Sequence, residues 1–234
     1  MQVHHKLSKE DAHATARGVQ ATEMRREVLG DDDTAAVVLL YDLETTGLMY
    51  TTQKKEKVWP RIVQIAVKVI KTGETFDSYV DPQISIPPAA TTIHGITNEI
   101  AKLAPTFDCV IHQLFDMLSN VVCPQDKIVL MAHNGKKFDE PILREEFQRW
   151  EIPVPTNWFF ADSIPLFKSI LQKSGSKSFS LAALYDRLFS APIPKAHSAC
   201  GDIDALERCL RKVLPGACGD IESRVISAIL SSIA

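Results

Sequence analysis

The hydrophobic pattern first predicts a set of strands, two of which are buried on both faces. An almost uninterrupted apolar run covers residues 37–43 and a second covers residues 127–132, and such runs are typical of central strands in a sheet. Residues 61–70 and 75–80 have the pattern of two strands joined as a hairpin, and residues 158–161 predict a short strand. These segments are the candidate core of one sheet.

Amphipathic helices separate and follow these strands. In residues 107–118 apolar side chains recur three or four positions apart, which is the stripe of a helix packed on a core. Pro141 and Ser180 stand at the starts of two further helices, and residues 203–213 and 221–229 outline two more. Strands that alternate with helices predict an α/β fold in which helices cover the faces of the sheet.

The polar segments set the domain boundaries. The chain has 234 residues, which suits one large domain with tails. Residues 1–34 are polar and mixed in charge, and they predict a flexible N-terminal tail. Residues 35–214 hold the domain itself, and residues 215–234 predict a C-terminal helix packed on the domain or extending it. Residues 49–60, which include three lysines and a proline, indicate a solvated loop.

Composition limits the partners and the compartment. Lys and Arg number 26 against 29 Asp and Glu, a formal charge of −3, which argues against a protein that coats nucleic acid through bulk positive charge. A nuclease is compatible with this balance, because several acids could lie beneath metal ions. The five cysteines form no C-x-x-C pair, and the chain has no apolar signal segment or membrane span. We therefore expect an intracellular protein, nuclear, cytoplasmic or organellar, that is neither secreted nor bound to a membrane.

Five residues in three short segments carry the candidate chemistry: Asp42, Glu44, Asp139, His197 and Asp202. Side chains alternate along a strand, so Asp42 and Glu44 point to the same side, where two carboxylates repel each other unless a cation lies between them. Carboxylates with a single imidazole suit Mg²⁺ or Mn²⁺, which are hard cations that prefer oxygen ligands. The pattern therefore favours metal-assisted hydrolysis of a phosphodiester.

Each of these residues also has a simpler structural explanation. Asp42 and Glu44 could lie at an exposed strand end, although the apolar run before them indicates a central strand, and ligands gather at the carboxyl ends of such strands. Asp139 could cap a helix. His197 could be a surface or helix-cap residue. Five helical residues turn through about 140°, so His197 and Asp202 would not share one face of a helix. It reaches the same site as Asp202 only if it lies in the loop before the helix, with Asp202 in the first turns.

The three segments resemble the exonuclease motifs of the DEDDh group within the ribonuclease H-like superfamily. Their letters are DLETTG, AHNGKKFD and HSACGD, in the same order along the chain as the three motifs. Leu48 after the first motif and the His133-Asn134-Gly135 step make them most similar to the three-prime repair exonucleases. The resemblance covers residues 35–214 and implies a central mixed five-stranded sheet flanked by helices.

The resemblance also implies roles for individual residues. Two Mg²⁺ ions, for which Mn²⁺ could substitute, would be held by four acids: Asp42, Glu44, Asp139 and Asp202. His197 would be the general base that deprotonates the attacking water. Substrate contacts would come from six residues of the cleft: Thr45, Leu48, Ile96, His133, Asn134 and Phe138. Phe138 stands where the family often has a tyrosine, and core packing explains Ile96 equally well.

These implications predict a metal-dependent 3′→5′ exonuclease that acts on DNA 3′ ends and releases nucleoside 5′-monophosphates. Single strands should be preferred, because the cleft must separate the terminal base from its neighbours. Three alternatives stay open: the same enzyme acting on RNA, a catalytically silent nuclease fold that serves as a binding module, and a proofreading subunit of a polymerase. A homodimer is expected only by analogy with relatives that pair through an edge strand.

Overall fold

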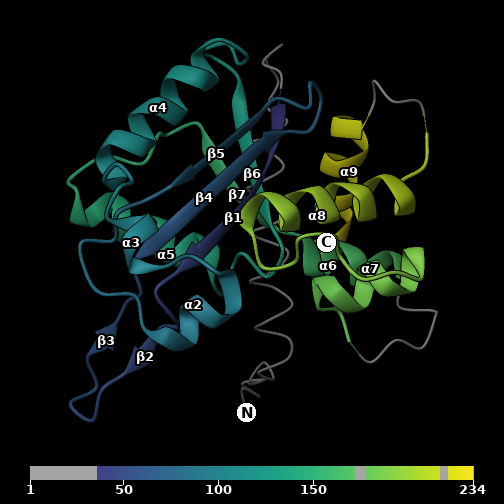
Figure 1. Cartoon of the computed structure of the whole chain (residues 1–234). Helices are drawn as coiled ribbons and strands as arrows, with labels where there is room; N and C mark the ends of the chain where they lie inside the picture. Colours follow the sequence, from purple (N-terminus) through teal and green to yellow (C-terminus); the bar gives the residue numbers. More distant parts are fainter. Residues whose placement is uncertain (1–35, 172–177, 217–220, 234) are drawn as a thin grey trace, which may run out of the picture.

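A mixed five-stranded sheet lies at the centre of the protein (Figure 1). The computed structural model describes residues 36–171, 178–216 and 221–233. The strands follow the spatial order β5-β4-β1-β6-β7, and their bounds in that order are Thr75–Tyr79, Ile62–Val69, Ala36–Thr45, Lys127–Ala132 and Trp158–Asp162. The pairs β1–β4 and β4–β5 are antiparallel, whereas β1–β6 and β6–β7 are parallel. The predicted α/β class and mixed sheet are confirmed.

Helices cover both faces of the sheet and enclose two separate cores (Figure 1). One face carries α4 (Phe107–Ser119) and α5 (Asp139–Arg149), and the other carries α6 (Ser163–Leu171), α7 (Leu181–Phe189), α8 (Ala199–Val213) and α9 (Ile221–Ile233). In β1, Val38 and Leu40 belong to the core beneath α8, while Leu39 and Tyr41 belong to the opposite core. Asp42 continues the register of Val38 and Leu40, so the strand directs its carboxylate towards the α8 side.

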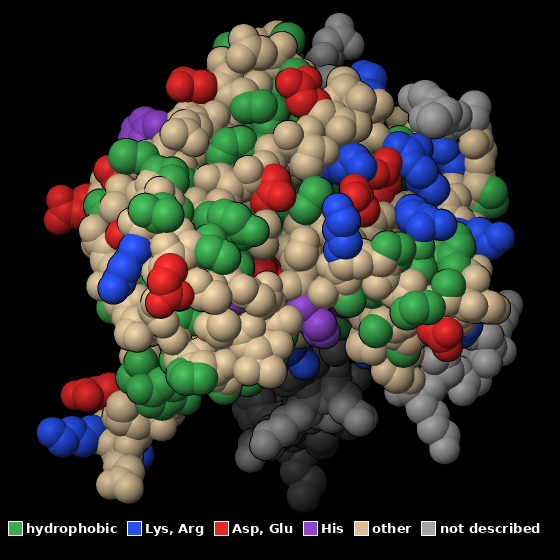
Figure 2. Space-filling view, in the orientation of Figure 1, with side chains coloured by type: hydrophobic (Ala, Val, Ile, Leu, Met, Phe, Trp, Pro, Cys, Tyr) green, Lys and Arg blue, Asp and Glu red, His purple; other side chains and the backbone are tan. Residues whose placement is uncertain are grey.

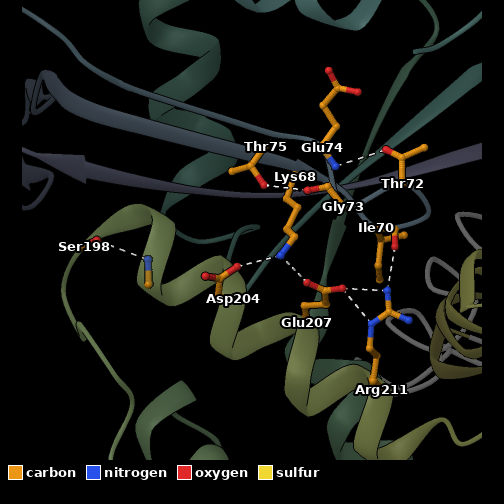
Figure 3. A network of polar contacts seen from close by, with 11 residues as sticks. Lys68, Ile70, Thr72, Gly73, Glu74, Thr75, Ser198, Asp204, Glu207 and Arg211 are labelled. Atoms are coloured by element: carbon orange, nitrogen blue, oxygen red, sulfur yellow. Dashed lines mark hydrogen bonds and ion pairs between the residues drawn. The ribbon is translucent and has the colours of Figure 1, made fainter. Parts of the chain in front are cut away.

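A chain of charged contacts fixes α8 on the sheet (Figure 3). The Lys68 ammonium in β4 donates to Asp204 Oδ1 at 2.8 Å and lies 2.7 Å from Glu207 Oε2. Glu207 also accepts from Arg211 at 2.8 Å, and Arg211 donates to the Ile70 carbonyl oxygen at 2.9 Å. Because both acids lie in α8, these contacts set where the first turns of that helix meet the sheet.

The structure adds elements to segments that the sequence pattern leaves irregular. Residues 49–60, predicted to be a solvated loop, contain a small hairpin of β2 (Tyr50–Thr51) and β3 (Lys57–Val58). Two short helices without a predicted counterpart follow, α2 (Pro88–His94) and α3 (Asn98–Ala101). The loop prediction is wrong for the hairpin because strands of two residues are too short to carry a detectable hydrophobic period.

The two ends of the chain are described to different extents. The predicted N-terminal tail, residues 1–34, lies outside the described residues. Near the C-terminus, α9 packs Val225 and Ile229 into the core beneath α8, and Glu222 Oε1 accepts from the Val38 N–H at 3.0 Å. Within the described ranges, every helix is too short or too polar to cross a bilayer.

Candidate functional site: an acidic centre beside an apolar cleft

Three carboxylates meet where the end of β1 faces the start of α8. Carboxylate oxygens of Asp42, Glu44 and Asp202 lie within 4.8 Å of one another. The first two alternate with Leu43, which points into the opposite core. Asp202 reaches the same place because it lies in the first turn of α8, whose N-cap Ser198 accepts from a backbone N–H of that turn at 3.3 Å. The fold thus brings together predicted ligands that are far apart in the sequence.

Asp139 extends this acidic centre from the other side of the strand end. Its side chain is 2% exposed, and its Oδ1 accepts from the Leu43 N–H at 3.2 Å. Asp139 is outside the group of three whose oxygens lie within 4.8 Å, yet its charge acts on Asp42. Asp139 is not the helix cap that the sequence analysis left open, because Phe138 is the N-cap residue of α5.

Burial and mutual repulsion raise the pKa values of these acids. Burial raises the pKa of Asp42 well above its ordinary range, and the neighbouring carboxylates raise it further. Burial, with the charge of Asp202, raises the pKa of Glu44 to about 7. Burial also raises the pKa of Asp139 to about 7, although hydrogen bonds from backbone N–H groups oppose this effect. The four carboxylates therefore resist full ionisation at neutral pH unless positive charge lies among them.

The donor set of this centre fits divalent cations. All the candidate ligands are carboxylate oxygens, which hard cations such as Mg²⁺ and Mn²⁺ prefer. A bound cation would also offset the repulsion that raises the pKa values of Asp42 and Glu44. The donor atoms and the charge of the acidic centre are therefore those of a site for divalent metal ions.

His197 lies in the loop that leads into α8, which is the placement that its spacing from Asp202 requires. Its side chain is exposed, and its backbone has a φ of 63°, in the left-handed region. Burial raises the pKa of Asp202, while the imidazole of His197 and its backbone N–H act in the opposite direction. The loop thus presents an exposed imidazole beside one of the candidate metal ligands.

His133 and Asn134, two of the predicted substrate contacts, make contacts within the protein and do not line the cavity beside Glu44. His133 Nδ1 lies 2.8 Å from Ser163 Oγ, and its Nε2 lies 2.8 Å from the Phe179 carbonyl oxygen, so both ring nitrogens are occupied. Asn134 has a φ of 64°, and its N–H donates to Asp162 Oδ1 at 3.1 Å. Asp162 accepts from two further backbone N–H groups of the same region. Sequence analysis missed Asp162, although its place directly after a predicted strand is a usable signal.

An apolar cavity of about 660 Å³ opens beside Glu44. Three of the predicted substrate contacts line it: Thr45, Leu48 and Phe138. Leu48 is 75% exposed, which is unusual for a leucine beside a buried strand. Ile96 is only 3% exposed and packs in a small separate core, so its side chain has the packing role that the sequence left open.

The remaining walls of the cavity come from residues that sequence analysis missed. Tyr50, Val58 and Trp59 line it from the β2–β3 hairpin, and Ile93 and His94 line it from α2. The only sequence signal was the presence of two aromatic residues in an otherwise polar stretch. The site therefore has two contrasting parts, a carboxylate centre and an adjoining apolar cleft.

Comparison with known proteins places this arrangement among nucleases. The exonuclease family model (RNase_T) matches residues 39–209. The chloroplastic/mitochondrial exonuclease DPD1 of Arabidopsis thaliana is 33% identical over 183 residues, which are 75% of this chain and 55% of that protein. Human three-prime repair exonuclease 1 is 30% identical over 192 residues, 72% of this chain and 61% of that protein. The chain thus spans little more than half of these curated relatives.

Solved structures show the same fold at lower identity. Cell-death related nuclease 4 superposes with a TM-score of 0.61 at 19% identity, covering 75% of this chain and 62% of that one. The nuclease domain of 3′hExo, a DEDDh family member bound to rAMP, superposes with a TM-score of 0.60 at 18% identity, covering 80% and 96%. The sheet and its helices are therefore those of the ribonuclease H-like exonucleases.

Proposed function

Because the chain belongs to the exonuclease family, as a DEDDh-type nuclease with the ribonuclease H-like fold, we propose that it is a metal-dependent 3′→5′ exodeoxyribonuclease. Its substrate is the 3′ end of DNA, with single strands preferred, and its products are nucleoside 5′-monophosphates. The observation that supports this proposal is the convergence of Asp42, Glu44 and Asp202 within 4.8 Å, with Asp139 buried beside them. Fold stability gives no reason to gather four acids there, since their mutual repulsion opposes folding.

The four carboxylates hold two Mg²⁺ ions in this proposal, and Mn²⁺ can take their place. When bound, such ions lower the pKa of a coordinated water and stabilise the leaving 3′-oxygen. The contribution of the protein is to hold the carboxylate ligands in place before the substrate binds. Asp42 and Glu44 are held by the register of β1 and Asp202 by the capped first turn of α8, so little reorganisation is needed when substrate arrives.

His197 is the proposed general base. It takes a proton from the water that attacks phosphorus, the bond from phosphorus to the 3′-oxygen breaks, and that oxygen is protonated from solvent. Histidine ordinarily titrates near neutral pH, which suits proton transfer under cellular conditions. The carboxylate of Asp202 is close enough to interact with the ring, so it stabilises the imidazolium that forms.

Leu48 is the proposed wedge against the terminal base. The turn that carries it is held by Thr45, whose hydroxyl donates to the Gly47 carbonyl oxygen at 2.7 Å. An exposed leucine gains free energy when a base covers it, and an unpaired 3′ end offers its base without first melting a duplex. His133 and Asn134 act in this proposal by shaping the turn before α5, because both make their hydrogen bonds within the protein.

A panel of three labelled substrates tests the proposal. Single-stranded DNA, blunt duplex DNA and RNA of one sequence, each labelled at the 5′ end, are incubated with Mg²⁺, with Mn²⁺ or with a chelator. We expect a ladder that shortens from the 3′ end of single-stranded DNA only when a divalent ion is present. Faster loss of RNA would favour the ribonuclease alternative. Absence of product in every lane, together with binding of the oligomers, would support the silent module.

Two variants separate metal-dependent chemistry from folding. Asp42→Ala and Asp202→Asn should each reduce product formation by about 1,000-fold or more, because each removes a proposed ligand charge. Thermal unfolding of both variants should stay cooperative. Full activity in either purified variant would contradict the metal assignment.

The compartment and the oligomeric state are part of the same proposal. Four of the five cysteines lie within the described residues, and all four are free thiols, which is typical of an intracellular protein. Among the described strands, β5 lies at one edge of the sheet, and this edge is the proposed contact with a second copy. Light scattering of the purified protein would measure the dimer, and a monomer at all concentrations would contradict it.

A further inference from the structure

The β2–β3 hairpin gives the cleft an aromatic wall that the proposed chemistry does not use. Tyr50 and Val58 are cross-strand partners in this hairpin, so they share one face, and both line the cavity beside Glu44. Trp59 follows directly and lines the cavity too, as does Ile93 of α2. Figure 1 shows the hairpin projecting below the sheet next to α2.

This wall is too exposed to be explained as core. Tyr50 is 59% exposed and Ile93 is 59% exposed, and with Leu48 they form an apolar surface that is open to water. Clustered exposed apolar side chains of this kind usually mark a binding surface. Trp59 is half-buried, and its ring packs partly against the core beneath α4 and α5, which holds it in a defined orientation.

Positive charge accompanies the aromatic rings. The Lys57 ammonium lies 5.6 Å from the centre of the Trp59 ring, and the exposed Lys54 and Lys55 lie in the turn of the hairpin. Figure 2 shows basic side chains at the projecting tip, at the lower left of the molecule. Aromatic rings next to lysines are the combination that binds single-stranded nucleic acid, since rings stack on bases while ammonium groups attract phosphates.

We propose that the β2–β3 hairpin is a base-binding arm that selects unpaired 3′ ends. Tyr50 and Trp59 contact the terminal nucleobase in the cavity, and the nearby lysines attract the phosphate backbone. A base inside a duplex must leave its stack before it can reach these rings, which makes paired ends poorer substrates. This inference rests on the proposed function and adds the residues that set its strand preference.

The test compares an intact 3′ end with one that lacks its last base. Tyr50→Ala and Trp59→Ala are assayed on a single-stranded oligomer, on a blunt duplex of the same sequence, and on a single strand whose last nucleoside is replaced by tetrahydrofuran. Each variant should raise KM for the intact single strand by about 10-fold, with kcat changed less than about 3-fold. On the strand without a terminal base the same variants should change KM less than about 2-fold.

Controls keep folding separate from base contact. Trp59→Phe retains a ring and should restore most of the affinity that Trp59→Ala loses. Tyr50 is largely exposed, so Tyr50→Ala tests the arm even if Trp59→Ala unfolds. Leu103→Ala removes a 90% exposed apolar side chain outside the cavity and should leave KM unchanged.

The outcomes distinguish this inference from the proposed function. If the unaltered protein hydrolyses none of the oligomers, the proposed function fails. If it hydrolyses them and both hairpin variants keep its KM and its preference for single strands, the arm is refuted. Equal losses on the intact and the base-free ends would also refute it, since the rings would then act without contacting the base.

Discussion

The two halves of the acidic centre are held in different ways. The buried Asp139 and the half-buried Asp42 form what we call the buried half, on the central strand and the start of α5, with Asp139 fixed by the Leu43 N–H. His197 and Asp202 belong to an open half, formed by an exposed loop and the first turn of α8. In the buried half the sheet register decides where charge lies. In the open half a loop conformation decides where the His197 imidazole lies.

The open half depends on two supports outside the site. Gly201 lets the loop approach α8, because a Cβ at this position would overlap the carbonyl oxygen of Lys195. Lys68 holds the same helix on the sheet through its contacts with Asp204 and Glu207 (Figure 3). The His197 imidazole is therefore positioned by residues outside the site, while Asp42 and Asp139 are positioned by their own strand and helix.

The largest effect should come from the buried half. Asp139→Asn keeps an oxygen that can accept the Leu43 N–H but removes a charge from the proposed metal site. We expect activity to fall by about 1,000-fold or more, while the metal-free protein becomes more stable because one repelling buried carboxylate is gone. Activity assays and chemical denaturation measure both effects. Asp116→Asn, an exposed acid of α4, is the matched control.

A somewhat smaller effect should come from the open half. His197→Ala should lower kcat by about 100-fold with little change in KM, because a proton acceptor is lost but the binding surfaces remain. Steady-state kinetics across a pH range measures this. His112→Ala removes another exposed histidine, on α4, and should be neutral. If the kcat of His197→Ala were unchanged at every pH, His197 would not be the general base.

The support of the loop should have a moderate effect. Gly201→Ala should push the Lys195 to His197 loop away from α8 and lower kcat by about 10-fold, with little change in the thermal midpoint. The neighbouring Cys200→Ala adds no atom against the loop and serves as the control. Wild-type kcat in Gly201→Ala would show that the loop adapts and that the open half is less constrained than the contact implies.

The central strands of the sheet were predictable because each is an almost uninterrupted apolar run. The buried run at residues 37–43 is typical of a central strand, and residues 127–132 match β6 from end to end. The hairpin of β2 and β3 was not predictable, since two-residue strands have no period and Lys54, Lys55 and Lys57 suggest solvent. The proposed role of the hairpin rests on the placement of Trp59, which packs against the core and lines the cavity.

The part of the site that follows from the spacing of residues along a strand or a helix was predictable. Alternation along a strand requires Asp42 and Glu44 to share a side, and helical geometry requires His197 to precede the helix that carries Asp202. Asp162 and Trp59 were missed because their roles depend on contacts between distant segments, which no local pattern records.

The smallest expected effect is on the free energy of unfolding, and it depends on the charge of the buried half. Burial raises the pKa of Asp139 to about 7 and, together with Asp202, that of Glu44 to about 7, whereas unfolded carboxyl groups titrate near 4. Between about pH 4 and pH 7 the folded state therefore holds protons that the unfolded state has released. The free energy of unfolding of the metal-free protein should thus fall as the pH rises through this window.

Chemical denaturation in a chelator at pH 5.5 and pH 8 measures this slope. Asp139→Asn should reduce the loss of stability between the two pH values by an amount on the order of 2 kcal/mol, because its contribution to the proton difference is removed. Mg²⁺ should restore stability more at pH 8 than at pH 5.5, since the carboxylates must be ionised to bind it. If the free energy of unfolding changed equally between the two pH values in the unaltered protein and in the variant, burial would not destabilise the charged form of Asp139. The contrast between the buried half and the exposed loop would then be lost.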